Sequence, residues 1–123
     1  MKLELLDDTF AIHRLNPSAE IPDEVLGEAF FNVVRTKEEL SIVCRKSLAL
    51  NSDRRSQEWS CIKVSGPMEL NTVGILSKLT SVLADAHISI FAISTYDTDY
   101  ILIQVDKTDE AVAVLRDAGY QFK

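Results

Sequence analysis

The chain has 123 residues, of which 46% are hydrophobic and 26% are charged, and its formal net charge at pH 7 is −6. These values are typical of a compact globular protein with little room for a separate catalytic domain. The negative charge argues against a nucleic-acid partner, because such partners need clustered Lys and Arg side chains. No apolar run approaches ~20 residues, and no charged-then-apolar leader opens the chain. We therefore expect a cytoplasmic protein with no membrane partner.

The first half predicts strands, one short helix and a hairpin. Pro22 suits the first turn of a helix that runs to Gly27. The predicted strands are Leu3–Leu6, Phe10–Leu15, Phe30–Arg35 and Leu40–Arg45, and the hairpin turn is Thr36-Lys37-Glu38-Glu39.

A polar stretch then separates two halves. Residues 51–58 contain no apolar side chain, which is typical of a surface connection. The adjacent pair Arg54-Arg55 lies between acidic residues and fits a solvated linker better than a binding patch. We therefore expect two domains, residues 1–57 and residues 58–123.

The second half predicts the element order βαββαβ. Thr108 is expected to cap the second helix, Gly119 to end it in the C′ position, and Asp97-Thr98-Asp99 to form the turn between the central strands. The predicted elements are strand Trp59–Ser65, helix Gly74–Asp85, strand Ile88–Thr95, strand Tyr100–Val105, helix Asp109–Ala118 and strand Tyr120–Phe122.

The two halves share an order of features. In each, an apolar strand is followed by a threonine, an acidic turn and a second apolar strand. This order predicts an α+β protein of two tandem units, the first of them degenerate.

The helix that begins at Gly74 has an apolar face and an open start. Its apolar residues recur with a period near 3.6, and a helix N-terminus attracts negative charge. Gly74 lacks a Cβ and so lets another group approach the backbone N–H donors. The apolar face consists of Ile75, Leu76, Leu79, Val82, Leu83 and Ala86.

The strand Ile88–Thr95 carries apolar residues on both faces. A strand covered only by helices on one side normally alternates apolar and polar residues. The pattern therefore predicts a second layer, supplied by the other half or by a second subunit, although a central strand with tolerant packing is an alternative. We expect a homodimer, because a two-fold dimer is the commonest way to cover such a surface.

Cys44 and Cys61 each lie in the middle of a strand-like run, without C-x-x-C spacing. We expect both to be buried, reduced thiols. A zinc site would need His13 and His87 to converge on them, so no metal site and no cofactor are expected.

These residues resemble the ACT domain, an amino-acid-binding regulatory module of enzymes such as aspartate kinase. The resemblance rests on Val73-Gly74-Ile75-Leu76, the spaced Leu79 and Leu83, His87-Ile88-Ser89-Ile90 and the small polar end of the next strand. It is best from Trp59 to Asp106. The first half resembles the degenerate partner in a tandem ACT protein, such as the aspartate kinase regulatory region or the tandem-ACT arginine sensor of animal cells. The resemblance implies ferredoxin-like βαββαβ units, antiparallel sheets with helices on one face, and a small amino-acid effector held between units.

The resemblance also implies a ligand site. Backbone N–H groups of the loop Asn71, Thr72, Val73, Gly74 and Ile75 would hold an α-carboxylate, and Ser94, Thr95, Tyr96 and Asp97 would face the ammonium or the side chain. Many ACT loops carry Asp ahead of the glycine, whereas this chain has the uncharged Asn71, which makes Asp97 the ammonium anchor. In the alternative reading, Asn71 or Thr72 only caps the helix and Asp97 only serves the turn.

The sequence contains no nucleophile-elbow, P-loop or dinucleotide motif. We therefore expect a non-catalytic sensor. One alternative is a protein-binding module that has lost its ligand. Another is a small acylphosphatase-like hydrolase, although the loop from Gly66 to Asn71 has no basic residue for a phosphate.

Overall fold

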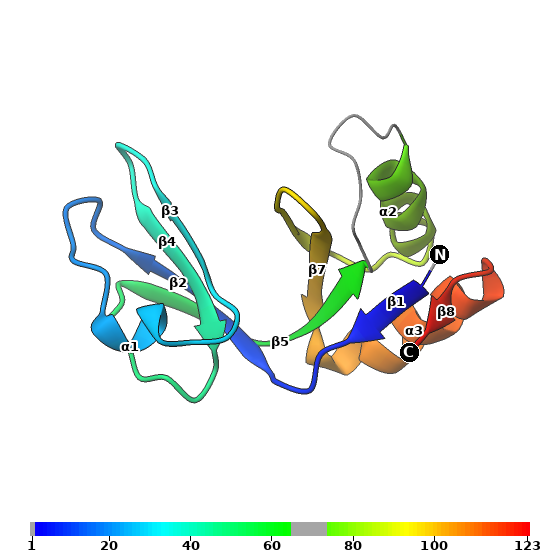
Figure 1. Cartoon of the computed structure of the whole chain (residues 1–123), viewed down its shortest axis with the longest axis horizontal. Helices are drawn as coiled ribbons and strands as arrows, with labels where there is room; N and C mark the ends of the chain where they lie inside the picture. The colour runs from blue at the N-terminus through cyan, green and yellow to red at the C-terminus, as the bar shows by residue number, and fades with distance from the viewer. Residues whose placement is uncertain (1, 65–73) are drawn as a thin grey trace. The chain divides into compact units, whose positions relative to one another are not determined.

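The computed structural model describes residues 2–64 and 74–123, which form two compact units (Figure 1). The N-terminal unit is Asp8–Trp59, and the C-terminal unit comprises the described residues of Met1–Asp7 and Ser60–Lys123. The expected pair of ACT-like domains, 1–57 and 58–123, stays a prediction. The compact units divide the chain differently, because its first strand belongs to the C-terminal unit.

The N-terminal unit is a sheet of strand order β3-β4-β2-β5 with one short helix. A complete βαββαβ unit would have a second helix after β4. Residues 46–53 form a turn and a loop at that place, so the unit is degenerate as predicted. Its elements are β2 (Phe10–Leu15), α1 (Asp23–Leu26), β3 (Asn32–Arg35), β4 (Leu40–Arg45) and the first part of β5 (Arg54–Val64).

The prediction of a linker over residues 51–58 is wrong for its second half, because Arg54 onward is strand β5. In this unit β5 pairs only with β2, with His13 opposite Arg55. An edge strand needs backbone pairing on one side alone and tolerates charged side chains. The strand was predicted as a loop because its first residues, Arg54, Arg55 and Ser56, are polar and exposed.

The C-terminal unit has the strand order β8-β1-β5-β7-β6. Its β5, β7 and β6 strands follow the predicted ferredoxin-like order, and β1 lies between β5 and β8 (Figure 1). Leu3 of β1 pairs with Val64 in the antiparallel direction and with Phe122 in the parallel direction. Its elements are β1 (Lys2–Leu5), the last part of β5, α2 (Ile75–Asp85), β6 (Phe91–Ser94), β7 (Asp99–Gln104), the 3-10 turn η1 (Val105–Lys107), α3 (Thr108–Asp117) and β8 (Gln121–Phe122).

Helices α2 and α3 bury their apolar stripes against one face of this sheet, as predicted. Ile101 and Ile103 of β7 alternate toward the helices, as a two-residue period requires. The buried cluster consists of Leu3, Ile62, Val64, Leu79, Leu83, Ile88, Ile101, Ile103, Ala111 and Leu115. None of the helices within residues 2–64 and 74–123 is long and apolar enough to cross a membrane.

The N-terminal unit has its own core, on the face that carries α1. Val25 of α1 is fully buried there. The buried cluster consists of Leu15, Val25, Leu40, Ile42 and Cys44, with Ala19, Ile21, Phe31, Val33, Leu48 and Leu50 packed against it.

Both long helices end in the same backbone motif. After α3, Gly119 N–H donates to Arg116 O at 2.9 Å and Tyr120 N–H donates to Leu115 O at 3.0 Å, with Gly119 at φ +101°. This is a Schellman motif, and the C′ position predicted for Gly119 is confirmed.

After α2, His87 occupies the same position. It has φ +61°, and its N–H donates to Ala84 O at 2.9 Å while Ile88 N–H donates to Leu83 O at 3.0 Å. Ile88 therefore packs against its own helix end. For this reason β6 begins only at Phe91, later than the predicted strand Ile88–Thr95.

The predicted capping role of Thr108 is wrong. Helix α3 begins at Thr108 directly after η1, and its N-cap residue is Lys107 without a side-chain hydrogen bond. The Thr108 hydroxyl instead forms a hydrogen bond of 2.7 Å with the Ser60 hydroxyl of β5.

Candidate functional site

The β6–β7 hairpin turn holds four of the predicted site residues close to one another in sequence. Thr95 N–H donates to Thr98 O at 2.8 Å, the Thr95 hydroxyl donates to the same oxygen at 2.9 Å, and Thr98 N–H donates to Thr95 Oγ1 at 3.1 Å. The turn is thus Thr95–Thr98, not the predicted Asp97–Asp99. The role of Thr95 visible in the structure is to build this turn.

The β3–β4 turn of the N-terminal unit has the same design. Thr36 N–H donates to Glu39 O at 2.8 Å, and the N–H groups of Glu38 and Glu39 donate to Thr36 Oγ1 at 3.1 and 3.2 Å. The strands that leave the two turns, β4 and β7, share one sequence of buried and exposed positions. The predicted echo between the halves is therefore a repeated hairpin.

Gly74 is the N-cap residue of α2, directly before the predicted helix residue Ile75. Its φ of +87° is left-handed, no side-chain hydrogen bond from the described residues caps the helix, and Gly74 O accepts the Lys78 N–H at 3.0 Å. A Cβ at this position would meet nothing within 4 Å. Asn71, Thr72 and Val73, the remaining predicted carboxylate donors, lie outside the described residues.

The other predicted residues lie on the hairpin. Ser94 ends β6 and is exposed, Tyr96 is 78% exposed at the tip, and Asp97 is exposed beside it. The hairpin tip and the start of α2 lie at the same end of the C-terminal unit (Figure 1). This arrangement brings the two parts of the predicted site to one end of the unit.

Asp99 is a residue that the sequence analysis misread. It begins β7 opposite Ser94 and is only 8% exposed. It alternates with Ile101 and Ile103, so it belongs to the face that α2 and α3 cover. Its carboxylate has no hydrogen-bond or ion-pair partner among the described residues. Among the described residues, the buried polar atoms without a partner do not include the Asp99 oxygens, so this carboxylate reaches solvent from a core position and is a candidate ligand residue.

The repeat contained a signal for Asp99. The β3–β4 register pairs Arg35 with Leu40, and the β6–β7 register pairs Ser94 with Asp99. Asp99 therefore stands where the N-terminal unit has the fully buried Leu40. Aligning the two hairpins by their threonines would have found this acid in a core position.

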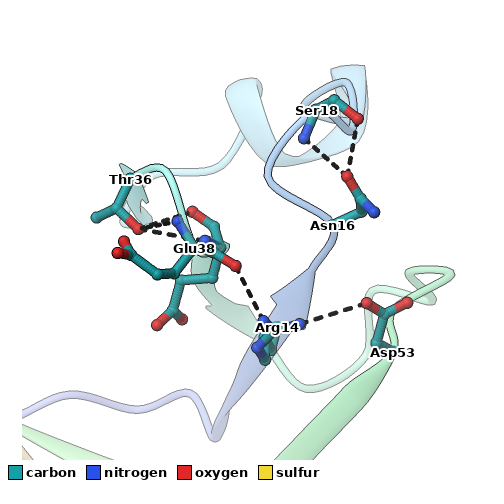
Figure 2. Close-up of polar contacts among 7 residues, drawn as sticks. Arg14, Asn16, Ser18, Thr36, Glu38 and Asp53 are labelled. Carbon is teal, nitrogen blue, oxygen red and sulfur yellow. Dashed lines mark hydrogen bonds and ion pairs between the residues drawn. The ribbon is translucent and has the colours of Figure 1, made fainter.

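The corresponding end of the N-terminal unit is filled by the chain's own polar groups (Figure 2). Arg14 Nη2 donates to Glu38 O at 2.9 Å, and Arg14 Nη1 lies 3.5 Å from Asp53 Oδ2. Asn16 Oδ1 accepts the Ser18 N–H at 3.0 Å, which shapes the loop after β2.

Arg35 fastens the same loop. Its guanidinium donates to Pro17 O and, at 2.8 Å, to Ala19 O. Ser94 occupies the equivalent position in the C-terminal unit and is too short for such contacts. At this position of the repeat, the N-terminal unit has an arginine that binds the unit's own loop, and the C-terminal unit has a serine.

The predicted burial of both thiols is confirmed. Both cysteines are free and fully buried. Burial raises the pKa of Cys61 to about 12, and burial, followed by the charge of Glu28, raises the pKa of Cys44. Within the described residues, no group of three or more His, Cys, Asp or Glu side chains could hold a metal ion.

No curated protein matches this chain. Among solved structures, an Agobacterium tumefaciens protein is 34% identical, covers 99% of this chain and 91% of its own, and has a TM-score of 0.91. The regulatory subunit of aspartate kinase from Thermus thermophilus is 10% identical, with a TM-score of 0.66 and coverage of 95% of this chain and 97% of its own. Aspartate kinase from Clostridium acetobutylicum is 14% identical, with a TM-score of 0.68 and coverage of 91% of this chain and 33% of its own.

Two family models match the sequence. One, described as an N-terminal domain, covers residues 8–48. The other, the ACT domain, covers residues 54–117, which is more than half of the chain. Its range contains α2, both strands of the β6–β7 hairpin and α3. The chain therefore belongs to the ACT domain family and shares its fold with the regulatory region of aspartate kinase.

Proposed function

We propose that the protein is a non-catalytic, cytoplasmic sensor that binds a small amino acid between the start of α2 and the β6–β7 hairpin. Membership of a family of regulatory modules supports a sensing role. The observation that carries the proposal is that two features lie at the same end of one unit: the left-handed Gly74 at the start of α2, and the Asp99 carboxylate, which has no partner within the described part of the chain.

In this proposal the α-carboxylate binds at the start of α2. The first N–H groups of a helix have no intrahelical acceptor, and no side chain of residues 2–64 or 74–123 caps them here. The left-handed Gly74 leaves space above them, because its missing Cβ would point into an open region. The predicted donors Asn71, Thr72, Val73, Gly74 and Ile75 remain part of the proposed site.

The ammonium group binds on the hairpin side. The proposal keeps Ser94, Thr95, Tyr96 and Asp97 near the ligand and adds Asp99 as a second candidate for the charge that meets the ammonium. Asp99 is held in strand β7 and is only 8% exposed, whereas Asp97 is exposed on the turn. We therefore assign the larger share of ammonium recognition to Asp99.

A thermal-shift screen against the proteinogenic amino acids tests the proposal. A ligand that binds only the folded state raises the melting temperature, and the shift grows with the logarithm of its concentration above Kd. We expect one amino acid, or a small group of related ones, to do so. If no amino acid shifts the melting point at millimolar concentration, the protein-binding alternative replaces the sensor.

Calorimetric titration of variants locates the site. Asp99→Asn should weaken binding at least about tenfold, since a hydrogen bond to a charged group contributes roughly 1.5–3 kcal/mol. Asp97→Asn should have a smaller effect. If the wild type and both variants bind the ligand with equal affinity, the hairpin is not part of the binding site.

Gly74→Ala probes the carboxylate end. Because Gly74 has a positive φ, any side chain there strains the backbone, so the variant needs a matched control. Gly119→Ala is that control, since Gly119 also has a positive φ and open space around its Cβ. Both variants should lose similar stability, whereas only Gly74→Ala should lose ligand affinity.

We further propose that the protein is a homodimer that transmits ligand binding by a change in subunit packing. Among the strands of residues 2–64 and 74–123, β6 pairs with β7 alone and so leaves one edge of the C-terminal sheet available. Light scattering at micromolar concentration should give about twice the chain mass of 13.8 kDa. A mass of one chain that does not change with concentration would contradict this part of the proposal.

A further inference from the structure

The N-terminal unit contains a cavity of about 290 Å³ at the end opposite its hairpin turn. Strand β4 begins after that turn and ends at Arg45, which borders the cavity. The cavity is therefore distinct from the proposed amino-acid site in the C-terminal unit. Its lining residues are Asp8, Phe10, Glu28, Ala29, Phe30 and Arg45.

Two aromatic rings form the apolar part of this cavity. Phe10 and Phe30 pack edge to face, with ring centroids 5.5 Å apart and an angle of 79° between the planes. Phe10 is 1% exposed, so its ring is fixed in the unit. Phe30 is partly exposed, so its ring is the one that presents a face to the cavity, and such a face carries partial negative charge and attracts cations.

The charged lining is negative overall. Glu28 and Arg45 form a two-point ion pair, with Nε–Oε1 at 2.5 Å and Nη2–Oε2 at 2.9 Å. The Arg45 guanidinium lowers the pKa of Glu28, so this carboxylate stays charged. Asp8 is a second carboxylate near Arg45, since its charge, after the contacts of Glu28, also raises the pKa of Arg45. Two carboxylates and one guanidinium leave the lining with one net negative charge, and the Asp8 carboxylate has no hydrogen-bond donor among the described residues.

From this lining we infer that the cavity binds a small organic cation, a primary ammonium ion with a short apolar tail. The ammonium group would donate to the Asp8 carboxylate, and the tail would lie against Phe30, which Phe10 supports from within the core. An anion is disfavoured, because the guanidinium that could receive it is already engaged by Glu28. The volume is at the lower end of the range for ligand pockets, which limits the ligand to a small molecule.

Three probes of one shape test this inference: butylammonium, 1-butanol and butyrate, each titrated into the whole protein while the aromatic NMR signals of Phe10 and Phe30 are followed. Butylammonium should produce saturable shifts in the millimolar range and bind at least about tenfold tighter than either other probe, a difference of about 1.4 kcal/mol. Equal binding of 1-butanol would show an apolar hollow only, and preferential binding of butyrate would show an anion site. Either result, or no saturation by butylammonium, would overturn the inference.

Variants give the second arm of the test. Asp8→Asn should weaken butylammonium binding about tenfold, and Phe30→Leu should weaken it several-fold through loss of the ring face. Asp7→Asn is the matched control, because Asp7 is the neighbouring exposed carboxylate and does not line the cavity. An equal loss in Asp7→Asn and Asp8→Asn would reduce the effect to general charge and refute a specific site. Failure of the amino-acid screen would leave these outcomes unchanged, since the two sites share no residue.

Discussion

The two cysteines illustrate how burial decides side-chain chemistry. Only the thiolate reacts rapidly, and the raised pKa values of Cys44 and Cys61 keep both side chains protonated at neutral pH. We predict that iodoacetamide labels neither thiol of the native protein within minutes, whereas both react fully in urea. Mass spectrometry of time points checks this, and rapid native labelling of either residue would contradict the burial seen here.

His13 is the buried group whose titration should affect stability. It is 1% exposed, its Nδ1 lies 2.9 Å from Ser52 Oγ, and its Nε2 has no hydrogen-bond partner among the described residues. Burial, and after it the charge of Arg55, lowers the pKa of His13 below 6.5. The folded protein therefore holds the neutral ring at pH values where the unfolded chain takes up a proton.

The sign of the pH effect follows from this difference in proton binding. The contribution of His13 is complete above pH 6.5 and is lost as pH falls below that value, because protonation then stabilises the unfolded state. We predict that His13→Gln reduces the loss of stability between about pH 7.5 and about pH 5.5, measured as urea midpoints. His87→Gln is the control, since His87 is exposed. An unchanged pH dependence in His13→Gln would assign the effect to other groups.

The C-terminal ends of α2 and α3 have different residues at the left-handed C′ position, so the cost of a side chain there can be compared directly. Both are Schellman motifs, but one has Gly119 and the other His87 in the left-handed position. A side chain in this conformation costs about 1 kcal/mol, so we predict that His87→Gly stabilises the protein by about 0.5–1 kcal/mol. Gly119→Ala should destabilise it by a similar amount. Urea denaturation of both variants checks the pair, and a loss of stability in His87→Gly would show that its side chain has a stabilising contact.

Elements fixed by local chemistry were predictable from the sequence. Strands β2 and β4, the Thr36 turn and the C′ role of Gly119 depend on neighbouring residues, and the structure confirms them. Strand β5 was only half recognised, because the exposed Arg54 and Arg55 are compatible with a strand only when β2 supplies the backbone partners. Long-range pairing of this kind leaves no local periodicity to read.

The candidate site shows the same limit. Gly74 and the hairpin were recognisable, since a glycine before an amphipathic helix and an acidic turn are local patterns. The burial of Asp99 was not, because an Asp after a turn usually remains in the turn. Its position in the strand depends on the register with Ser94, which Thr95 fixes by closing the turn one residue earlier.

For the whole molecule, the important prediction concerns β1. Leu3 is fully buried in the core of the C-terminal unit, whereas Leu5 on the same strand is 38% exposed. Leu3→Ala should therefore cost about 2–5 kcal/mol of unfolding free energy, and Leu5→Ala less than about 1 kcal/mol. Chemical denaturation of the two variants measures the difference. Equal, small losses would mean that β1 is dispensable to that core.

The position of β1 between β5 and β8 makes the N-terminal unit an insertion within the C-terminal one. During synthesis β1 leaves the ribosome before its partners, because Val64 follows only after the whole of Asp8–Trp59 and Phe122 follows later still. The chain loses conformational entropy when so long a loop closes, before the contacts of β1 can form. This cost slows folding. An early folded N-terminal unit would shorten that loop by holding its two ends in place. Folding of the inserted unit would then speed the folding of the unit that carries the proposed effector site.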